Sequence, residues 1–211
     1  MPFDLWISFF IAAAILVVAP GPDNIFVTLQ SAIYGPRAGI FVTLGLCVGV
    51  CFHTCLVSLG VATVVATSPV LLFLIQCLGA SYLLYLAWGA WHAPEDKKET
   101  GAKGTGQLSS FQYWRRGVLM NITNPKVLIF FLAFFPQFIR EGTSNFDVMI
   151  QMFIMGLTFM GLTLIIFSVL AWCAGSLAER LLSPRMQYIL NKASACIFAV
   201  LAATVLLAKV N

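Results

Sequence analysis

An acidic and a basic residue follow two proline-containing segments that lie about half a chain apart. Asp23 comes directly after Pro20-Gly21-Pro22, and Lys126 comes directly after Asn121-Ile122-Thr123-Asn124-Pro125. The two charged residues are 103 positions apart, as are the prolines that immediately precede them. An acid can bind an ammonium group and a base can bind a carboxylate, so this pair has the chemistry to bind a zwitterion.

The surroundings of these two charges are strongly apolar. Of the 211 residues, 60% are hydrophobic and 9% are charged, whereas soluble domains have about 25% charged residues. The stretch from Ala38 to Pro94 contains no Asp, Glu, Lys or Arg. Since about 20 apolar residues cross the hydrocarbon core of a bilayer, this stretch predicts two spans. The composition therefore indicates a polytopic membrane protein and excludes a soluble or disordered chain.

Six apolar segments cover most of the chain, over about 4–30, 39–66, 70–91, 114–139, 147–173 and 187–208. In lipid these must form helices or a closed barrel, and their length and lack of alternation favour helices. We expect an all-α membrane protein with six transmembrane helices in a single domain over 1–211. A hydrophilic linker at about 93–112 separates repeat 1 (about 1–92) from repeat 2 (about 113–211).

The basic residues predict the orientation in the membrane. Nine of them follow the first, third and fifth segments: Arg37, Lys97, Lys98, Lys103, Arg115, Arg116, Arg180, Arg185 and Lys192. Only Arg140 and Lys209 fall on the opposite side. Because positive charge accumulates on the cytoplasmic side, the linker is expected in the cytoplasm and both termini outside. If the first segment is re-entrant, five segments span and the N-terminus lies inside.

Both proline-containing segments predict helices that break inside the membrane. Proline and glycine free backbone groups that lipid cannot satisfy, so such breaks occur against protein or a water-filled cavity. They fall in the first and fourth segments, and three spans per half require the second repeat to be inverted. Interrupted helices at equivalent positions of inverted repeats indicate a mid-membrane transport site. Helices that begin near Pro22 and Pro125 would direct free N–H groups toward an anionic group there.

The roles of the two intramembrane charges remain open on the sequence alone. Each costs about 2.5–3.5 kcal/mol at a helix centre, so Asp23 and Lys126 form either a structural ion pair or part of a substrate site. Asp23 is also a candidate proton-coupling carboxylate. His53 continues the stripe of Gly45 and Gly49, a pair that favours close helix approach. We expect His53 to face protein, as a packing residue in preference to a proton relay.

Four phenylalanines follow Lys126: Phe130, Phe131, Phe134 and Phe135. They occupy two faces of one helix, so most of them are expected to be lipid or packing contacts.

These motifs together resemble the LysE/RhtB superfamily of bacterial amino-acid exporters. The resemblance rests on Pro20-Gly21-Pro22, on the series Gly35, Gly39, Gly45 and Gly49, on Asn121 to Lys126, and on Phe135-Pro136-Gln137-Phe138. It covers essentially the whole chain and implies export of amino acids across the bacterial inner membrane in exchange for protons. It also implies that a homodimer can form. The position of Asp23 varies between acid and amide in the family.

The substrate-binding candidates are Pro20, Gly21, Pro22, Asp23, Asn24, Asn121, Asn124, Pro125 and Lys126, and the proton-coupling candidates are Asp23 and His53. A basic substrate would call for a further buried acid, so a neutral amino acid such as threonine, homoserine or leucine is preferred. The main alternative is a divalent-cation transporter, although a hard cation requires several carboxylates.

Other classes of function lack the residues that they require. An enzyme would need a nucleophile with a base, or a set of metal ligands, and neither pattern occurs. No cysteine adjoins the helix-breaking prolines, which argues against thiol electron transfer, and the net charge of +4 is too small to suggest nucleic acid. We therefore expect no metal, no cofactor and no enzymatic activity.

Overall fold

A computed structural model describes residues 2–19, 21–67, 69–93, 107–139, 144–181 and 183–207. All regular structure in these ranges is helical. The elements are α1 (Phe3–Val18), α2 (Pro22–Tyr34), α3 (Pro36–Thr67), α4 (Pro69–Trp91), α5 (Ser110–Ile122), α6 (Pro125–Phe134), the 3₁₀ helix η1 (Phe135–Phe138), α7 (Asn145–Leu181) and α8 (Pro184–Leu207). This confirms the all-α class.

Four of these helices, α3, α4, α7 and α8, are long and apolar enough to cross a membrane alone. Two further candidates are bent pairs. The axes of α1 and α2 differ by 56°, and those of α5 and the segment Pro125–Phe138 differ by 49°. The described helices therefore provide four candidate spans, or up to six if each bent pair counts as one. The predicted interruptions in the first and fourth apolar segments are confirmed.

The helix after each interruption begins where its proline predicts. Pro22 is the first residue of α2 and Pro125 is the first residue of α6. Proline fits this position because the first N–H groups of a helix have no partner within it. The N-cap of α2 is Gly21, with extended backbone, and that of α6 is Asn124, whose side chain accepts a hydrogen bond from the backbone N–H of Lys126.

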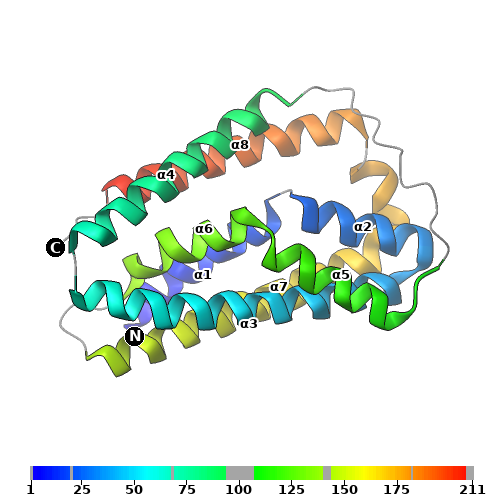
Figure 1. Ribbon diagram of the computed structural model, residues 1–211. Helices are drawn as coiled ribbons and strands as arrows, with labels where there is room; N and C mark the ends of the chain where they lie inside the picture. The colour runs from blue at the N-terminus through cyan, green and yellow to red at the C-terminus, as the bar shows by residue number, and fades with distance from the viewer. Residues whose placement is uncertain are drawn as a thin grey trace.

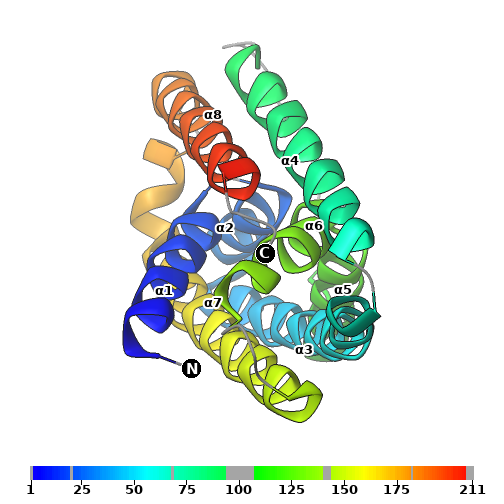
Figure 2. The same cartoon turned by 90° about the vertical axis from the view of Figure 1, so that its left-hand side faces the viewer.

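The broken helices lie between two pairs of long helices (Figures 1 and 2). On one side α4 packs along α8, and on the other α3 packs along α7. Helices α1, α2 and α6 occupy the space between these pairs, while α5 packs along α3. Protein therefore covers each interruption in part: Asp23 and Asn124 are buried there, whereas Pro22 and Pro125 are exposed.

The contact between α3 and α5 depends on two glycines, because a side chain at either position would collide with the other helix. A Cβ atom at Gly45 would collide with the carbonyl oxygen of Trp114, and one at Gly117 would collide with that of Val42. Small residues permit such close backbone approach between membrane helices. The predicted role of Gly45 in close helix packing is confirmed.

The aromatic residues of α6 and η1 form the centre of the core. Phe130, Phe131, Phe134 and Phe135 are all buried. Phe159 of α7 lies 5.7 Å from Phe130 and 5.3 Å from Phe131, measured between ring centroids. The four phenylalanines are therefore packing contacts within the protein and not lipid contacts.

Candidate functional site

The C-terminal end of α1 lies at the first interruption and is covered by side chains from other helices. Asn24 of α2 donates a hydrogen bond from Nδ2 to the carbonyl oxygen of Val17 over 2.9 Å. Lys126 of α6 donates from Nζ to the carbonyl oxygen of Ala19 over 3.0 Å. The last carbonyl groups of a helix lack partners within it and carry partial negative charge. A cation at this point is therefore electrostatically favoured.

Asp23 lies in the first turn of α2 and is buried, with 7% of its surface exposed. Its Oδ2 accepts a hydrogen bond from Nδ2 of Asn124 over 2.9 Å, whereas its buried Oδ1 has no hydrogen-bond partner. A negative charge is favoured at the N-terminal end of a helix. Asp23 is thus held in place with one oxygen left available to a ligand.

Asn124 joins the two interrupted segments. Its Oδ1 accepts from the backbone N–H of Lys126 over 3.1 Å and so caps α6, while its Nδ2 holds Asp23. Among the described residues no direct ion pair forms between Asp23 and Lys126. Asn124 instead connects the carboxylate of Asp23 to the backbone N–H of Lys126, while the amine of Lys126 donates to the carbonyl oxygen of Ala19.

Gly21 provides the space into which Lys126 extends. A Cβ atom at Gly21 would lie 3.2 Å from Nζ of Lys126, closer than ordinary van der Waals contact. The absence of a side chain at position 21 therefore lets the amine reach the end of α1.

A cavity of about 20 Å³ lies between these groups. It is lined by Leu16, Val17, Asp23, Asn24, Asn121, Lys126, Val127, Phe159, Thr163 and Phe167. The structure thus brings together four candidate residues: Asp23, Asn24, Asn121 and Lys126. The volume is comparable to that needed for one water molecule, so the cavity is too small for an amino acid and must widen to admit one.

The remaining candidates hold the shape of the interruptions instead of lining this cavity. Pro22 and Pro125 start their helices and are exposed. Asn124 and Gly21 act through Asp23 and Lys126 as described above. Pro20 lies outside the described residues.

His53 of α3 is buried behind the second interruption, with 1% of its surface exposed. Its Nε2 lies 3.0 Å from the carbonyl oxygen of Asn121, near the end of α5. Its Nδ1 and the Oδ1 of Asn121 are buried without hydrogen-bond partners. The prediction that His53 faces protein is confirmed, and among the described residues its hydrogen-bond contact with the cavity lining is to Asn121.

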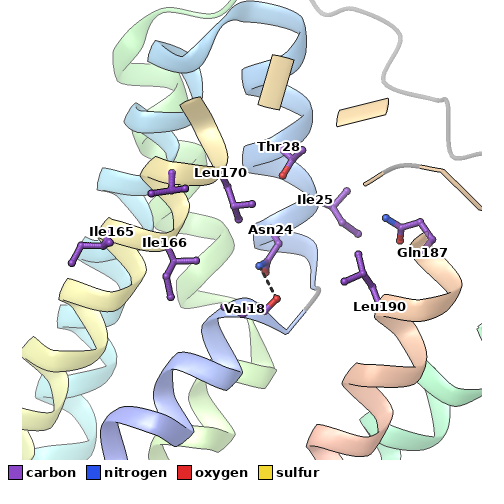
Figure 3. Close-up of a pocket in the computed structure, with 10 residues that line it drawn as sticks. Val18, Asn24, Ile25, Thr28, Ile165, Ile166, Leu170, Gln187 and Leu190 are labelled. Carbon is purple, nitrogen blue, oxygen red and sulfur yellow. Dashed lines mark hydrogen bonds between the residues drawn. The ribbon is translucent and has the colours of Figure 1, made fainter. Parts of the chain in front are cut away.

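The sequence did not indicate that α7 lines the small cavity, nor that a second, larger cavity exists. Phe159, Thr163 and Phe167 recur every four residues along one face of α7 and line the small cavity. A cavity of about 320 Å³ lies between α2, α7 and α8 and is lined by Val18, Asn24, Ile25, Thr28, Ile165, Ile166, Val169, Leu170, Gln187 and Leu190 (Figure 3). Asn24 and Thr28 lie four residues apart and so share one face of a helix, and this spacing could have pointed to the larger cavity.

Comparisons with known proteins agree with this architecture. The family model described as LysE type translocator matches residues 14–209. An uncharacterized membrane protein of Vibrio cholerae is 30% identical over 91% of both chains. The homoserine/homoserine lactone efflux protein of Salmonella typhimurium is 28% identical over 96% of both chains. The leucine efflux protein of Salmonella choleraesuis is 34% identical over 63% of this chain and 62% of its own.

No solved structure matches the chain significantly. The family consists of transporters and not enzymes, and it does not favour the divalent-cation alternative. Among the described residues no group of three or more His, Cys, Asp or Glu is placed to hold a metal ion. The family match over nearly the whole chain, together with four to six candidate spans, shows that this multi-pass bacterial membrane protein belongs to the LysE family of translocators.

Proposed function

We propose that this protein exports neutral amino acids from the cytoplasm across the inner membrane, in exchange for protons. The family and the two relatives named as efflux proteins for homoserine and leucine support amino-acid export. The observation that carries the proposal is the meeting of Asp23 and Lys126 at two helix interruptions, with Asn124 between them.

The two charges are arranged to bind the two charged groups common to all amino acids. The substrate carboxylate replaces the carbonyl oxygen of Ala19 as the partner of Lys126, and it gains from the positive end of α6. The substrate ammonium group binds Oδ1 of Asp23, which has no hydrogen-bond partner in the structure. Oδ1 of Asp23 thereby obtains the hydrogen-bond partner that a buried polar atom requires.

The lining of the small cavity supports a neutral substrate. Asp23 is the single acidic residue among its described lining residues, and the substrate ammonium group uses it. A basic side chain would enter with an unpaired charge, which is costly away from water. Neutral amino acids such as threonine, homoserine and leucine avoid this cost.

We further propose that the chain forms six spans as two inverted repeats. The order broken pair, long helix, long helix occurs twice, as α1–α2, α3, α4 and as α5–α6, α7, α8. Under an exchange of halves α3 replaces α7 and α4 replaces α8, and these are the pairs that pack together. The basic residues favour the cytoplasm for the linker at about 93–112 and the outside for both termini.

Proton exchange follows if Asp23 binds the ammonium group and a proton alternately. Facing the cytoplasm, Asp23 releases its proton and binds substrate. Facing outward, it takes up a proton, loses its charge and releases the ammonium group. His53 is a second proton carrier in this proposal, because its Nε2 lies 3.0 Å from the carbonyl oxygen of Asn121, a residue that lines the cavity.

Efflux from proteoliposomes tests the proposed function. Vesicles that contain the purified protein and a mixture of labelled amino acids are placed in a proton gradient. We expect neutral amino acids to leave faster than from protein-free vesicles, and faster with the gradient than without it. Retention of every amino acid would contradict export, and efflux that ignores the gradient would contradict proton exchange alone.

A further inference from the structure

The larger cavity differs from the small one in chemistry and in size. Its walls are mainly aliphatic, with Ile25 from α2, Ile166 and Leu170 from α7, and Leu190 from α8 directed into the space between these helices (Figure 3). Its volume of about 320 Å³ falls within the range of small-molecule sites. It can hold an amino-acid side chain, which the small cavity cannot.

The larger cavity lies on one particular side of the first interruption. Its lining on α2 follows the break, and Gln187 and Leu190 lie near the start of α8. The end of α2 and the start of α8 adjoin Arg37, Arg180, Arg185 and Lys192, which are four of the nine basic residues on the expected cytoplasmic side. The positive-inside rule therefore puts this cavity between the polar site and the cytoplasm.

Asn24 is the wall that the two cavities share. It lines the small polar cavity with Asp23 and Lys126, and it also lines the larger aliphatic cavity. Its amide is held across the end of α1 by hydrogen bonds to the carbonyl oxygens of Val17 and Val18, at 2.9 and 3.5 Å. Movement of this one side chain would join the two cavities into a site with a charged end and an aliphatic end.

We propose that the larger cavity is the subsite for an uncharged aliphatic side chain of the transported amino acid, with Asn24 as the movable partition. The charged groups of the substrate remain with Asp23 and Lys126. This inference rests on the proposed function and narrows its substrate class to amino acids with leucine-like side chains. A hydroxyl group against the aliphatic wall would lose its hydrogen bonds to water, so leucine is preferred to homoserine.

A lipid acyl chain is the competing occupant of this space. Ile165 and Val169 are 65% and 57% exposed and form the outer rim of the cavity, which faces the bilayer. However, Asn24, Thr28 and Gln187 also line the space, and a hydrocarbon tail gains nothing from three polar side chains. The charged groups of an amino acid on its way to Asp23 do gain from them, while its side chain stays against the aliphatic walls.

The test compares efflux of leucine, homoserine and alanine from the same proteoliposomes. The wild-type protein is expected to favour leucine over homoserine by about tenfold, the scale on which apolar pockets discriminate. Leu170→Trp fills the cavity and is expected to lower the leucine-to-alanine efflux ratio by about tenfold. The matched control is Leu157→Trp, at a 59% exposed position of α7 outside both cavities, which should leave the ratio unchanged.

A second variant changes the cavity in the opposite direction. Ile166→Ala enlarges it and is expected to raise phenylalanine efflux relative to leucine several-fold. Equal wild-type rates for leucine and homoserine, or side-chain selectivity unchanged in both variants, would overturn the subsite and leave amino-acid export intact. If the variants change the lipid bound to the protein and leave side-chain selectivity unchanged, the subsite would also be overturned. The occupant of the cavity would then be a lipid acyl chain. No export of any amino acid by the wild-type protein would instead overturn the proposed function itself.

Discussion

Nδ2 of Asn124 lies 2.9 Å from Oδ2 of Asp23, so one amide side chain connects the first turns of two helices from opposite halves of the chain. The same side chain caps α6 through its other end, because Oδ1 accepts from the backbone N–H of Lys126. Asn124 therefore positions the acid and the start of the helix that carries the base.

Replacement of Asn124 by leucine should destabilise the fold as well as the site. Asn124→Leu removes a helix cap, which costs about 0.5–2 kcal/mol, and leaves Asp23 buried without its donor. We expect a lower midpoint of thermal unfolding in detergent. Thr123→Val is the adjacent control, since its exposed hydroxyl bonds only to carbonyls of its own helix. Unfolding of Asn124→Leu at the wild-type temperature would refute the bridging role.

Asp23→Asn tests the proton-coupling role. The amide keeps the shape of the side chain but can no longer exchange a proton near neutral pH, so efflux should lose its response to a pH gradient. Exchange of labelled for unlabelled substrate across the vesicle membrane needs no net proton movement and should persist, with a raised KM because the neutral amide binds the ammonium group more weakly. If the variant accelerates efflux in a gradient as fully as the wild-type protein does, Asp23 is not the coupling residue.

Gly21→Ala tests whether the position of Lys126 matters for substrate binding. The backbone at Gly21 has φ −164° and ψ 178°, an extended conformation that alanine also adopts. The added Cβ instead meets Nζ of Lys126 at 3.2 Å, so the amine must shift away from Ala19. The KM for efflux should rise about threefold or more, equivalent to about 0.7 kcal/mol. Gly161→Ala, where a Cβ meets no atom within 4 Å, should leave KM unchanged.

Gly49→Ala tests the support of Asn121 by α3. A Cβ at Gly49 would lie 2.5 Å from Cβ of Asn121 and 2.6 Å from its Oδ1. Overpacking of this kind costs about 1–3 kcal/mol and should displace Asn121 from the cavity. In contrast, Gly60→Ala on the same helix meets no atom within 4 Å and should be neutral or slightly stabilising. If the two variants have equal stability and equal efflux rates when measured side by side, then Gly49 is not needed to make room for Asn121 against α3.

The start of the helix after each interruption could be predicted from local sequence rules. Pro22 and Pro125 determine where α2 and α6 begin, because proline lacks an N–H and favours the first position of a helix. The cost of intramembrane charge identified Asp23 and Lys126, and their proximity followed from the equivalent places of the two breaks. These inferences needed only the residue types and their spacing.

The contacts that refine the site could not be predicted in this way. The bond of Asn24 to Val17 depends on the bend between α1 and α2, and the walls of the larger cavity come from four helices, α1, α2, α7 and α8. The burial of Phe130 and its neighbours depends on α1 and α7, which the spacing within α6 does not specify. A homodimer, the orientation and the roles of the site residues stay predictions.

Direct binding of labelled leucine to the purified protein tests the central claim that Asp23 and Lys126 hold the charged groups of an amino acid. The measurement uses a scintillation proximity assay on the wild-type protein, Asp23→Asn and Lys126→Met, each checked for intact folding by its unfolding temperature. We predict saturable binding to the wild-type protein and affinity lowered at least tenfold in Lys126→Met, equivalent to about 1.4 kcal/mol. We also predict weaker binding to Asp23→Asn. Wild-type affinity in both folded variants would contradict the account.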